Sequence, residues 1–127
     1  MAENITILAD NIMEGTTPKI TATIQDEDGN AIADTALDTL TLTLYNLDDA
    51  DKTIINSRDG QDILDANNVA VDGSGVMVWS VQAGDTIIVG SDLVERHRAV
   101  FKWTYSSTTK AGSYVIDMAI RNLEKVT

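Results

Sequence analysis

Cysteine is absent from this chain of 127 residues, and proline and histidine each occur once. The absence of cysteine excludes disulfide cross-links and thiolate chemistry. Ser-His-Asp chemistry needs a base that titrates near neutral pH, and the one histidine, His97, falls on the apolar phase of a predicted strand. A structural role for His97 is therefore the better interpretation. The sequence predicts no catalytic residues and a protein that is not an enzyme.

Long apolar runs are also absent. No run approaches the about 20 residues that a membrane-spanning helix needs. The first residues, Met-Ala-Glu-Asn-Ile, lack the basic and apolar regions of a secretory signal, so we expect no export by a signal peptide. Basic residues are few, nine against twenty acidic ones, for a net charge of -11. Such a charge repels nucleic acid and anionic membranes, and we expect neither among the partners.

The charge that is present divides the chain into two parts. Residues 1–95 hold eighteen of the twenty acidic residues and only three basic ones, whereas residues 96–127 hold six basic and two acidic residues. The basic part also shows the alternation typical of two long strands, with its charges on the outward phase. Four of these charges, Arg96, Arg98, Lys102 and Arg121, are predicted to share one strand face. The alternatives are a protein interface, because arginine is enriched in interfaces, and a solvated outer face.

Hydrophobic content of 43% and short alternating segments between turn residues predict a single all-β domain over residues 1–127. The expected fold is an antiparallel β-sandwich of about seven to nine strands. Residues 1–14 are expected to form an N-terminal arm with an edge strand, and residues 57–68 an acidic loop insert with one helical turn near 61–66. A further helical turn can follow Gly84. The other predicted strands are 19–25, 40–45, 53–56, 68–72, 76–82, 95–106 and 113–122.

The core is predicted from the inward phase of these strands, which carries large apolar side chains. The strand over residues 76–82 is apolar on both phases, so it is either covered on both sides or meets a partner through the face of Trp79. We favour burial of Trp79 within the domain. The predicted core residues are Ile24, Leu42, Leu44, Trp79, Phe101, Trp103, Ile116 and Met118.

Two groups of aspartates invite a metal-binding interpretation. The segment Asp26–Asn30 resembles the start of a calcium loop, but the twelfth position, where an EF-hand needs glutamate, is Leu37, so a hairpin turn is the better interpretation. A calcium site could also form if two acidic loops meet at one end of the sandwich. Its ligands would come from Asp48, Asp49, Asp51, Asp59 and Asp62, with Asp65 nearby. We otherwise expect no cofactor.

The pattern of strands and turns resembles that of immunoglobulin-like β-sandwich domains in tailed-phage virion proteins, and in particular the N-terminal domain of phage baseplate upper proteins. The matching stretches are TPKITATIQDEDGNAI (Thr17–Ile32), LTLTLY (Leu40–Tyr45), VAVDGSGVMVW (Val69–Trp79), QAGDT (Gln82–Thr86) and a closing pair, Arg98–Tyr105 and Gly112–Ile120. The resemblance covers about residues 15–121. It departs from the family in the longer acidic insert and in the lack of a following fibre or receptor-binding domain.

The resemblance implies an immunoglobulin-like sandwich without a catalytic site. It implies a structural or adaptor subunit of a virion, at the head–tail joint, neck, tail, baseplate or capsid surface. Such a subunit would be assembled in the host cytoplasm and would dock in many copies with itself and with other virion proteins. The alternative is a carbohydrate- or cell-surface-binding module, with or without calcium. That alternative favours exposed aromatic side chains, and most of the six here fall on predicted core phases.

Overall fold

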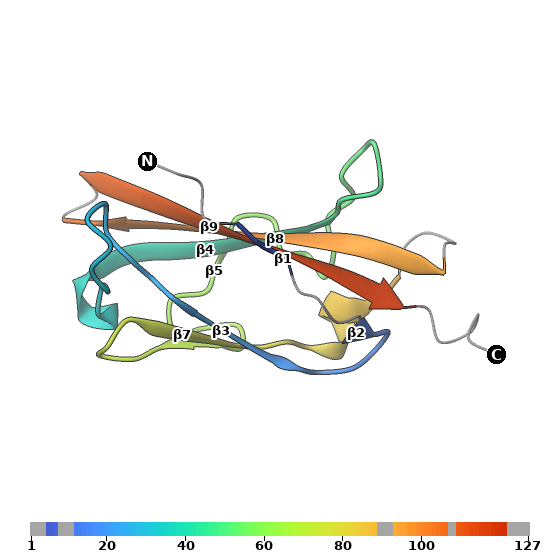
Figure 1. Cartoon of the computed structure of the whole chain (residues 1–127), viewed down its shortest axis with the longest axis horizontal. Helices are drawn as coiled ribbons and strands as arrows, with labels where there is room; N and C mark the ends of the chain where they lie inside the picture. Colours follow the sequence, from blue (N-terminus) through green and yellow to red (C-terminus); the bar gives the residue numbers. More distant parts are fainter. Residues whose placement is uncertain (1–4, 8–11, 89–92, 107–108, 122–127) are drawn as a thin grey trace.

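The computed structural model describes residues 5–7, 12–88, 93–106 and 109–121, and shows two β-sheets in two layers (Figure 1). The larger sheet has the order β1-β9-β8-β4-β5, with β2 also paired to β9, and the smaller has the order β3-β7-β6. The predicted all-β sandwich is therefore confirmed. The strands are β1 (Ile5–Ile7), β2 (Ile12–Met13), β3 (Lys19–Thr23), β4 (Leu37–Asn46), β5 (Gln61–Asp62), β6 (Val69–Val71), β7 (Val76–Ser80), β8 (Val94–Tyr105) and β9 (Lys110–Arg121).

The larger sheet is built on the β8–β9 hairpin. The two strands pair antiparallel over twelve residues each, from Val94 opposite Arg121 to Tyr105 opposite Lys110. β4 pairs antiparallel with the other side of β8. The other pairings of this sheet are antiparallel, whereas β1 and β2 pair with β9 in the parallel direction at this edge. A parallel partner must arrive through a crossover, and here the intervening chain passes through both sheets.

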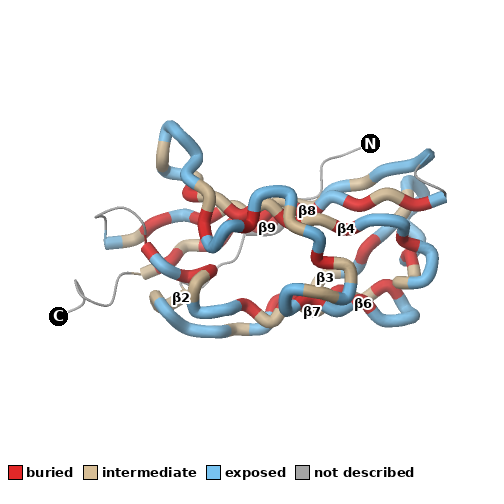
Figure 2. The backbone as a smooth tube through the Cα atoms, turned by 180° about the vertical axis from the view of Figure 1, so that it is seen from behind, coloured by how far each residue is buried: buried red, intermediate tan, exposed pale blue. Residues whose placement is uncertain are grey.

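The core lies between the two layers, and Figure 2 shows that buried and exposed residues alternate along the strands. All eight predicted core residues are buried. The rings of Trp79 on β7 and Phe101 on β8 meet edge to face across the two sheets, with centroids 5.7 Å apart. Aromatic pairs prefer this geometry because the positive ring edge faces the negative ring face. Trp79 is thus buried within the domain, as predicted.

Three segments differ from the expectation. The strand expected at residues 53–56 is reduced to an isolated bridge between Ile54 and Tyr45. The helical turn expected near residues 61–66 is not formed, because Gln61 and Asp62 pair with β4 as strand β5. β9 begins at Lys110, before the expected start at residue 113, so Gly112 lies inside the strand, directly opposite Trp103 on β8. The turn expected after Gly84 is a short 3-10 helix, η2 (Ala83–Thr86), and a second one, η1 (Asp34–Ala36), precedes β4. Within the described ranges, no helix has the length and apolarity to cross a membrane.

Candidate interaction face and buried polar network

The four basic residues proposed as an interface lie on the outer face of the larger sheet. In the β8–β9 register, Arg96 is opposite Ala119, Arg98 opposite Asp117, and Lys102 opposite Ser113, whereas Arg121 is opposite Val94. Residues opposite each other point to the same face, and that face repeats every second residue. The inward neighbours His97, Ala99 and Phe101 are fully buried, so the predicted phase of the basic residues is confirmed.

Arg98 is held by a carboxylate on the neighbouring strand. Its Nε and Nη2 donate to the two carboxylate oxygens of Asp117 at 2.7 and 2.8 Å. This bidentate geometry is the strongest form of arginine–carboxylate contact. The Asp117 carboxylate, together with a bond to Tyr45, raises the pKa of Arg98 against the opposing effect of partial burial. Arg98 is therefore a fixed part of the sheet surface.

The side chains of Arg96 and Lys102 are more exposed than that of Arg98. Arg96 lies 2.8 Å from Asp48 of the loop after β4, yet 61% of its side chain is exposed. Partial burial would raise the pKa of Asp48, but the backbone N–H and the guanidinium of Arg96 outweigh it and lower the pKa. Lys102 is exposed, and no ion pair joins it to an acidic residue in the described part of the chain. Lys102 thus differs from Arg96 and Arg98, which carboxylates hold in place.

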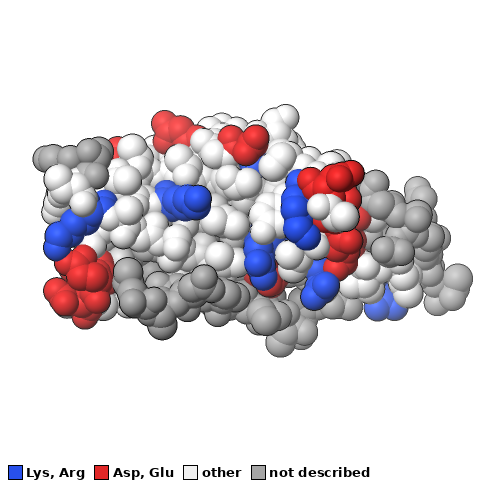
Figure 3. All heavy atoms as spheres, turned by 90° about the horizontal axis from the view of Figure 1, so that it is seen from above, with Lys and Arg blue, Asp and Glu red and all other residues white. Residues whose placement is uncertain are grey.

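Figure 3 shows this face of the larger sheet from above. Lysine and arginine side chains stand next to aspartate and glutamate side chains, and uncharged surface separates these groups from one another. The face therefore does not carry a continuous basic stripe. Between the charges lie threonines of β4 and valines of β8 and β9 that are half-buried: Thr41, Thr43, Val100 and Val115. Such a surface combines small side chains that allow close approach with charges that fix orientation.

Three of the five aspartates proposed as calcium ligands accept hydrogen bonds from other residues of the chain. Asp48 binds Arg96, Asp49 accepts bonds from Thr53 and from the backbone of Asp51, and Asp62 caps Leu64. The Thr53 hydroxyl, and after it the Asp51 N–H, lower the pKa of Asp49. Among the residues that the structure describes, no three histidine or acidic side chains converge as metal ligands would. The Asp26 side chain likewise caps Asp28 and Asn30, as expected of a hairpin turn.

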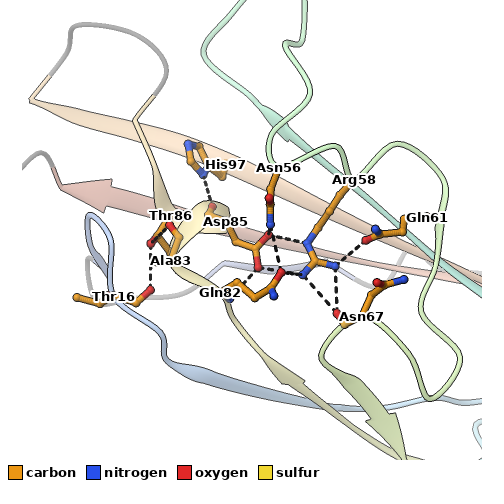
Figure 4. A network of polar contacts seen from close by, with 10 residues as sticks. All are labelled: Thr16, Asn56, Arg58, Gln61, Asn67, Gln82, Ala83, Asp85, Thr86 and His97. Carbon is orange, nitrogen blue, oxygen red and sulfur yellow. Dashed lines mark hydrogen bonds and ion pairs between the residues drawn. The ribbon is translucent and has the colours of Figure 1, made fainter.

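A buried ion pair between Arg58 and Asp85 of η2 was not anticipated from the sequence (Figure 4). Arg58 and Asp85 are 1% and 0% exposed. The Nε and Nη2 of Arg58 donate to the two carboxylate oxygens of Asp85 at 2.5 and 3.1 Å. The remaining N–H groups of the guanidinium reach Gln61, Gln82 and the carbonyl of Asn67. Every donor of the guanidinium is therefore satisfied without water.

Asp85 is the centre of this network. Besides Arg58, it accepts bonds from the Asn56 side chain at 2.9 Å and from the backbone N–H of Gln82 at 2.8 Å. The carbonyl of Asp85 accepts a bond from Nδ1 of His97 on β8 at 3.2 Å. The guanidinium carbon of Arg58 also lies 5.8 Å from the centroid of the Trp79 ring, within cation–π range. The network joins the 56–61 segment, η2 and the two sheets.

Two sequence signals could have pointed to this network. Arg58 is the one basic residue in the otherwise acidic insert, and Gln82 and Asp85 have the three-residue spacing of a capping box. Neither signal identifies the partner, because Arg58 and Asp85 are distant in sequence. The insert at residues 57–68 is consequently not a plain solvated loop, since Arg58 and Ile63 within it are buried.

Other surface features are a groove and two exposed hydrophobic side chains. The groove, with a volume of about 410 Å³, lies beside β6 and β7 and is lined by Asp65, Asn67, Asn68, Ala70 and Val78 among others. No aromatic side chain lines it, and the six aromatic residues of the chain are all buried or half-buried. Ile87 and Leu93 are 48% and 41% exposed and follow η2 and precede β8, respectively.

Comparison of the chain with known protein families, with curated proteins and with solved structures finds no match.

Proposed function

We propose that this protein is a non-enzymatic structural or adaptor subunit of a bacteriophage particle, which acts by docking in many copies to other virion proteins. The phage part of the proposal rests on the resemblance of residues 15–121 to virion sandwich domains. The docking part rests on one observation, the outer face of the larger sheet. That face is formed by long, regularly paired strands and carries arginines that are already oriented by carboxylates.

Preoriented arginines favour docking for an energetic reason. A side chain that is fixed before binding loses less conformational entropy when a partner arrives. Arg98 is fixed by Asp117, and Arg96 is fixed by Asp48 while most of its side chain stays accessible. Lys102 then supplies a charge that no acidic group of the described chain neutralises.

The absence of catalysis in this proposal is supported by the placement of His97. It is the chain's only histidine, it is fully buried, and both of its ring nitrogens are bonded. An imidazole so placed is out of reach of a substrate proton, which a general base must approach to about 3 Å. The carboxylates of Asp48, Asp117 and Glu27 bind arginine or lysine, so they do not form the carboxylate pair of an acid–base catalyst.

The test is to express the gene in its host, purify particles on a density gradient, and look for the protein in them. Particles that lack it are then incubated with purified wild-type protein, with Lys102→Glu, or with Lys52→Glu. Lys52 lies in the loop after β4, and its substitution makes the same change in net charge. We expect wild type and Lys52→Glu to bind the particles and Lys102→Glu to bind weakly. Particles that never contain the protein would overturn the proposal.

A further inference from the structure

The two edges of the smaller sheet differ in how their backbone groups are used. On either side of β6, two backbone bonds join the chain to β7: the N–H of Ser80 donates to the carbonyl of Asn68, and the N–H of Asp72 donates to the carbonyl of Val76. Because bonding direction alternates along a strand, the N–H groups of Val69 and Val71 point away from β7. They are nevertheless satisfied, since Val69 donates to the carbonyl of Ala66 and Val71 to the Asp65 carboxylate. A loop therefore closes the β6 edge.

The β3 edge is open as far as the described residues show. Val81 donates to Pro18, and Ile24 donates to Gly75, so the even-numbered residues of this segment face β7. The backbone groups of Lys19, Thr21 and Thr23 then face outward. No strand or side chain of the described part of the chain bonds to the backbone of these three residues on that side. In Figure 1, β3 runs along the margin of the lower layer. An open edge is a template for another strand.

We propose that this edge pairs with β3 of a second copy of the chain, antiparallel and with two-fold symmetry about Thr21. In that register Thr21 faces its own counterpart, and Lys19 faces Thr23 of the other copy. All outward N–H and C=O groups of the three residues would then be paired. On the inner side Ile20 would face Ala22, whose half-buried side chain already packs against the core. The two smaller sheets would become one continuous sheet.

A second copy is favoured as the occupant by the local charge. The chain as a whole has a net charge of -11, which opposes self-association. Residues 15–25, however, contain no acidic residue and one basic residue, Lys19. In the proposed register the two Lys19 residues are four positions apart, about 13 Å along the strand at 3.3 Å per residue. That separation exceeds the screening length of about 8 Å at physiological salt, so their repulsion is small.

Symmetry makes the register testable by charge. Thr21→Lys would place two lysines directly opposite each other, which is destabilising. Thr23→Glu would place a glutamate opposite Lys19 at both ends of the pairing, which is stabilising. Thr21→Pro would remove two bonds between the copies, and an edge strand tolerates proline where its N–H faces outward. Thr35→Glu, at an exposed position on η1, is the matched control for Thr23→Glu.

The experiment is sedimentation equilibrium of the full chain over a range of concentrations, with circular dichroism to verify that each variant is folded. We expect a wild-type dimer whose dissociation constant rises about tenfold in Thr21→Pro, from the loss of two hydrogen bonds. We expect about fivefold tighter association in Thr23→Glu at low salt, fading at high salt, and no change in Thr35→Glu. A monomeric wild type, or a Thr21→Pro variant that associates like wild type, would overturn the inference.

This inference rests on the proposed function only in naming a surface through which two copies would pair, and it fails separately from that function. If the protein is a monomer that still binds phage particles, the β3 pairing is wrong and the proposed function stands. If the protein forms the β3-paired dimer but is never found in particles, the virion role is wrong and the pairing stands.

Discussion

Nε2 of His97 and Oε2 of Glu95 lie 2.6 Å apart in the interior, on the same strand and two residues from each other. Nδ1 of His97 faces the carbonyl of Asp85, which can only accept, so Nδ1 must carry a proton. A contact of 2.6 Å between Nε2 and a carboxylate oxygen also needs a proton between the two atoms. The other oxygen of Glu95 accepts a bond from Asn46 at 3.1 Å. Glu95 thus joins His97 and Asn46 through hydrogen bonds in the interior.

Glu95→Gln is expected to cost less stability than Glu95→Ala. The glutamine amide can donate to Nε2 and still accept from Asn46, whereas alanine leaves two buried polar groups unpaired, at about 1–3 kcal/mol each. Urea unfolding of both variants measures the difference in the free energy of unfolding. Equal losses in the two variants would show that the hydrogen bonds of Glu95 do not stabilise the fold.

Breaking the Arg58–Asp85 pair is expected to be among the most damaging changes. Arg58→Met leaves the Asp85 carboxylate buried without its main partner, and removing one member of a buried pair costs about 3–5 kcal/mol. The matched change at the surface is Arg96→Met, which leaves Asp48 near solvent and should cost less than about 1 kcal/mol. Equilibrium unfolding of both variants tests this contrast. Similar losses at the two sites would mean that Arg58 is not held as described.

Gly112→Ala is expected to destabilise the hairpin. A Cβ at this position would lie 2.6 Å from Nε1 of Trp103, whose ring packs over the glycine, and overpacking of this kind costs about 1–3 kcal/mol. The control is Gly73→Ala, where a Cβ would meet nothing within 4 Å and the loss should stay within about 0.5 kcal/mol. Thermal unfolding compares them. A neutral Gly112→Ala would show that the indole can move aside freely.

Glu27 is expected to make stability depend on acid. Hydrogen bonds from Lys110 and then from Tyr105 lower the pKa of Glu27 from 4.5 to about 2. A lowered pKa in the folded state means that the contribution is complete above pH 4.5 and is lost as the pH falls toward 2. The difference in Tm between wild type and Glu27→Gln should therefore shrink over this interval. A difference that is constant with pH would exclude an ionised Glu27 as its cause.

Calcium is expected to leave the Tm unchanged, because Asp48 already accepts hydrogen bonds from Arg96 of β8, and Asp49 and Asp62 accept them from nearby residues of the chain. Thermal unfolding with added calcium and then with a chelator measures this. A rise in Tm that the chelator reverses would favour the calcium-assisted surface-binding alternative over the proposed virion role.

The strands that were predictable from the sequence are those with clear alternation. β3, β4, β7 and β8 each bury one phase in the core, so the pattern of apolar residues carries their position. Polar segments were harder, because their structure depends on partners elsewhere in the chain. β5 exists through its pairing with β4, and Arg58 is buried through Asp85. The position of Gly112 follows from the ring of Trp103, which no local pattern reveals.

The candidate interface was predictable only in part. Alternation placed Arg96, Arg98 and Lys102 on one face, since strand periodicity alone decides that. It could not separate the arginines, which are bound to carboxylates, from the lysine, which is not. The position of Asp117 opposite Arg98 depends on the register of the hairpin, which the alternation of either strand does not give.

The parallel pairing of β1 with β9 has a consequence for synthesis on the ribosome. Ile5 emerges early and waits for Val115 before its backbone can be bonded. Pairings between residues so distant in sequence form slowly, because the loop must close before any contact rewards it. A chain cut short before β9 would therefore leave the larger sheet without its central hairpin and β1 without a partner. The larger sheet can therefore form only after β9 has been synthesised, and we expect truncated chains to be open to proteases.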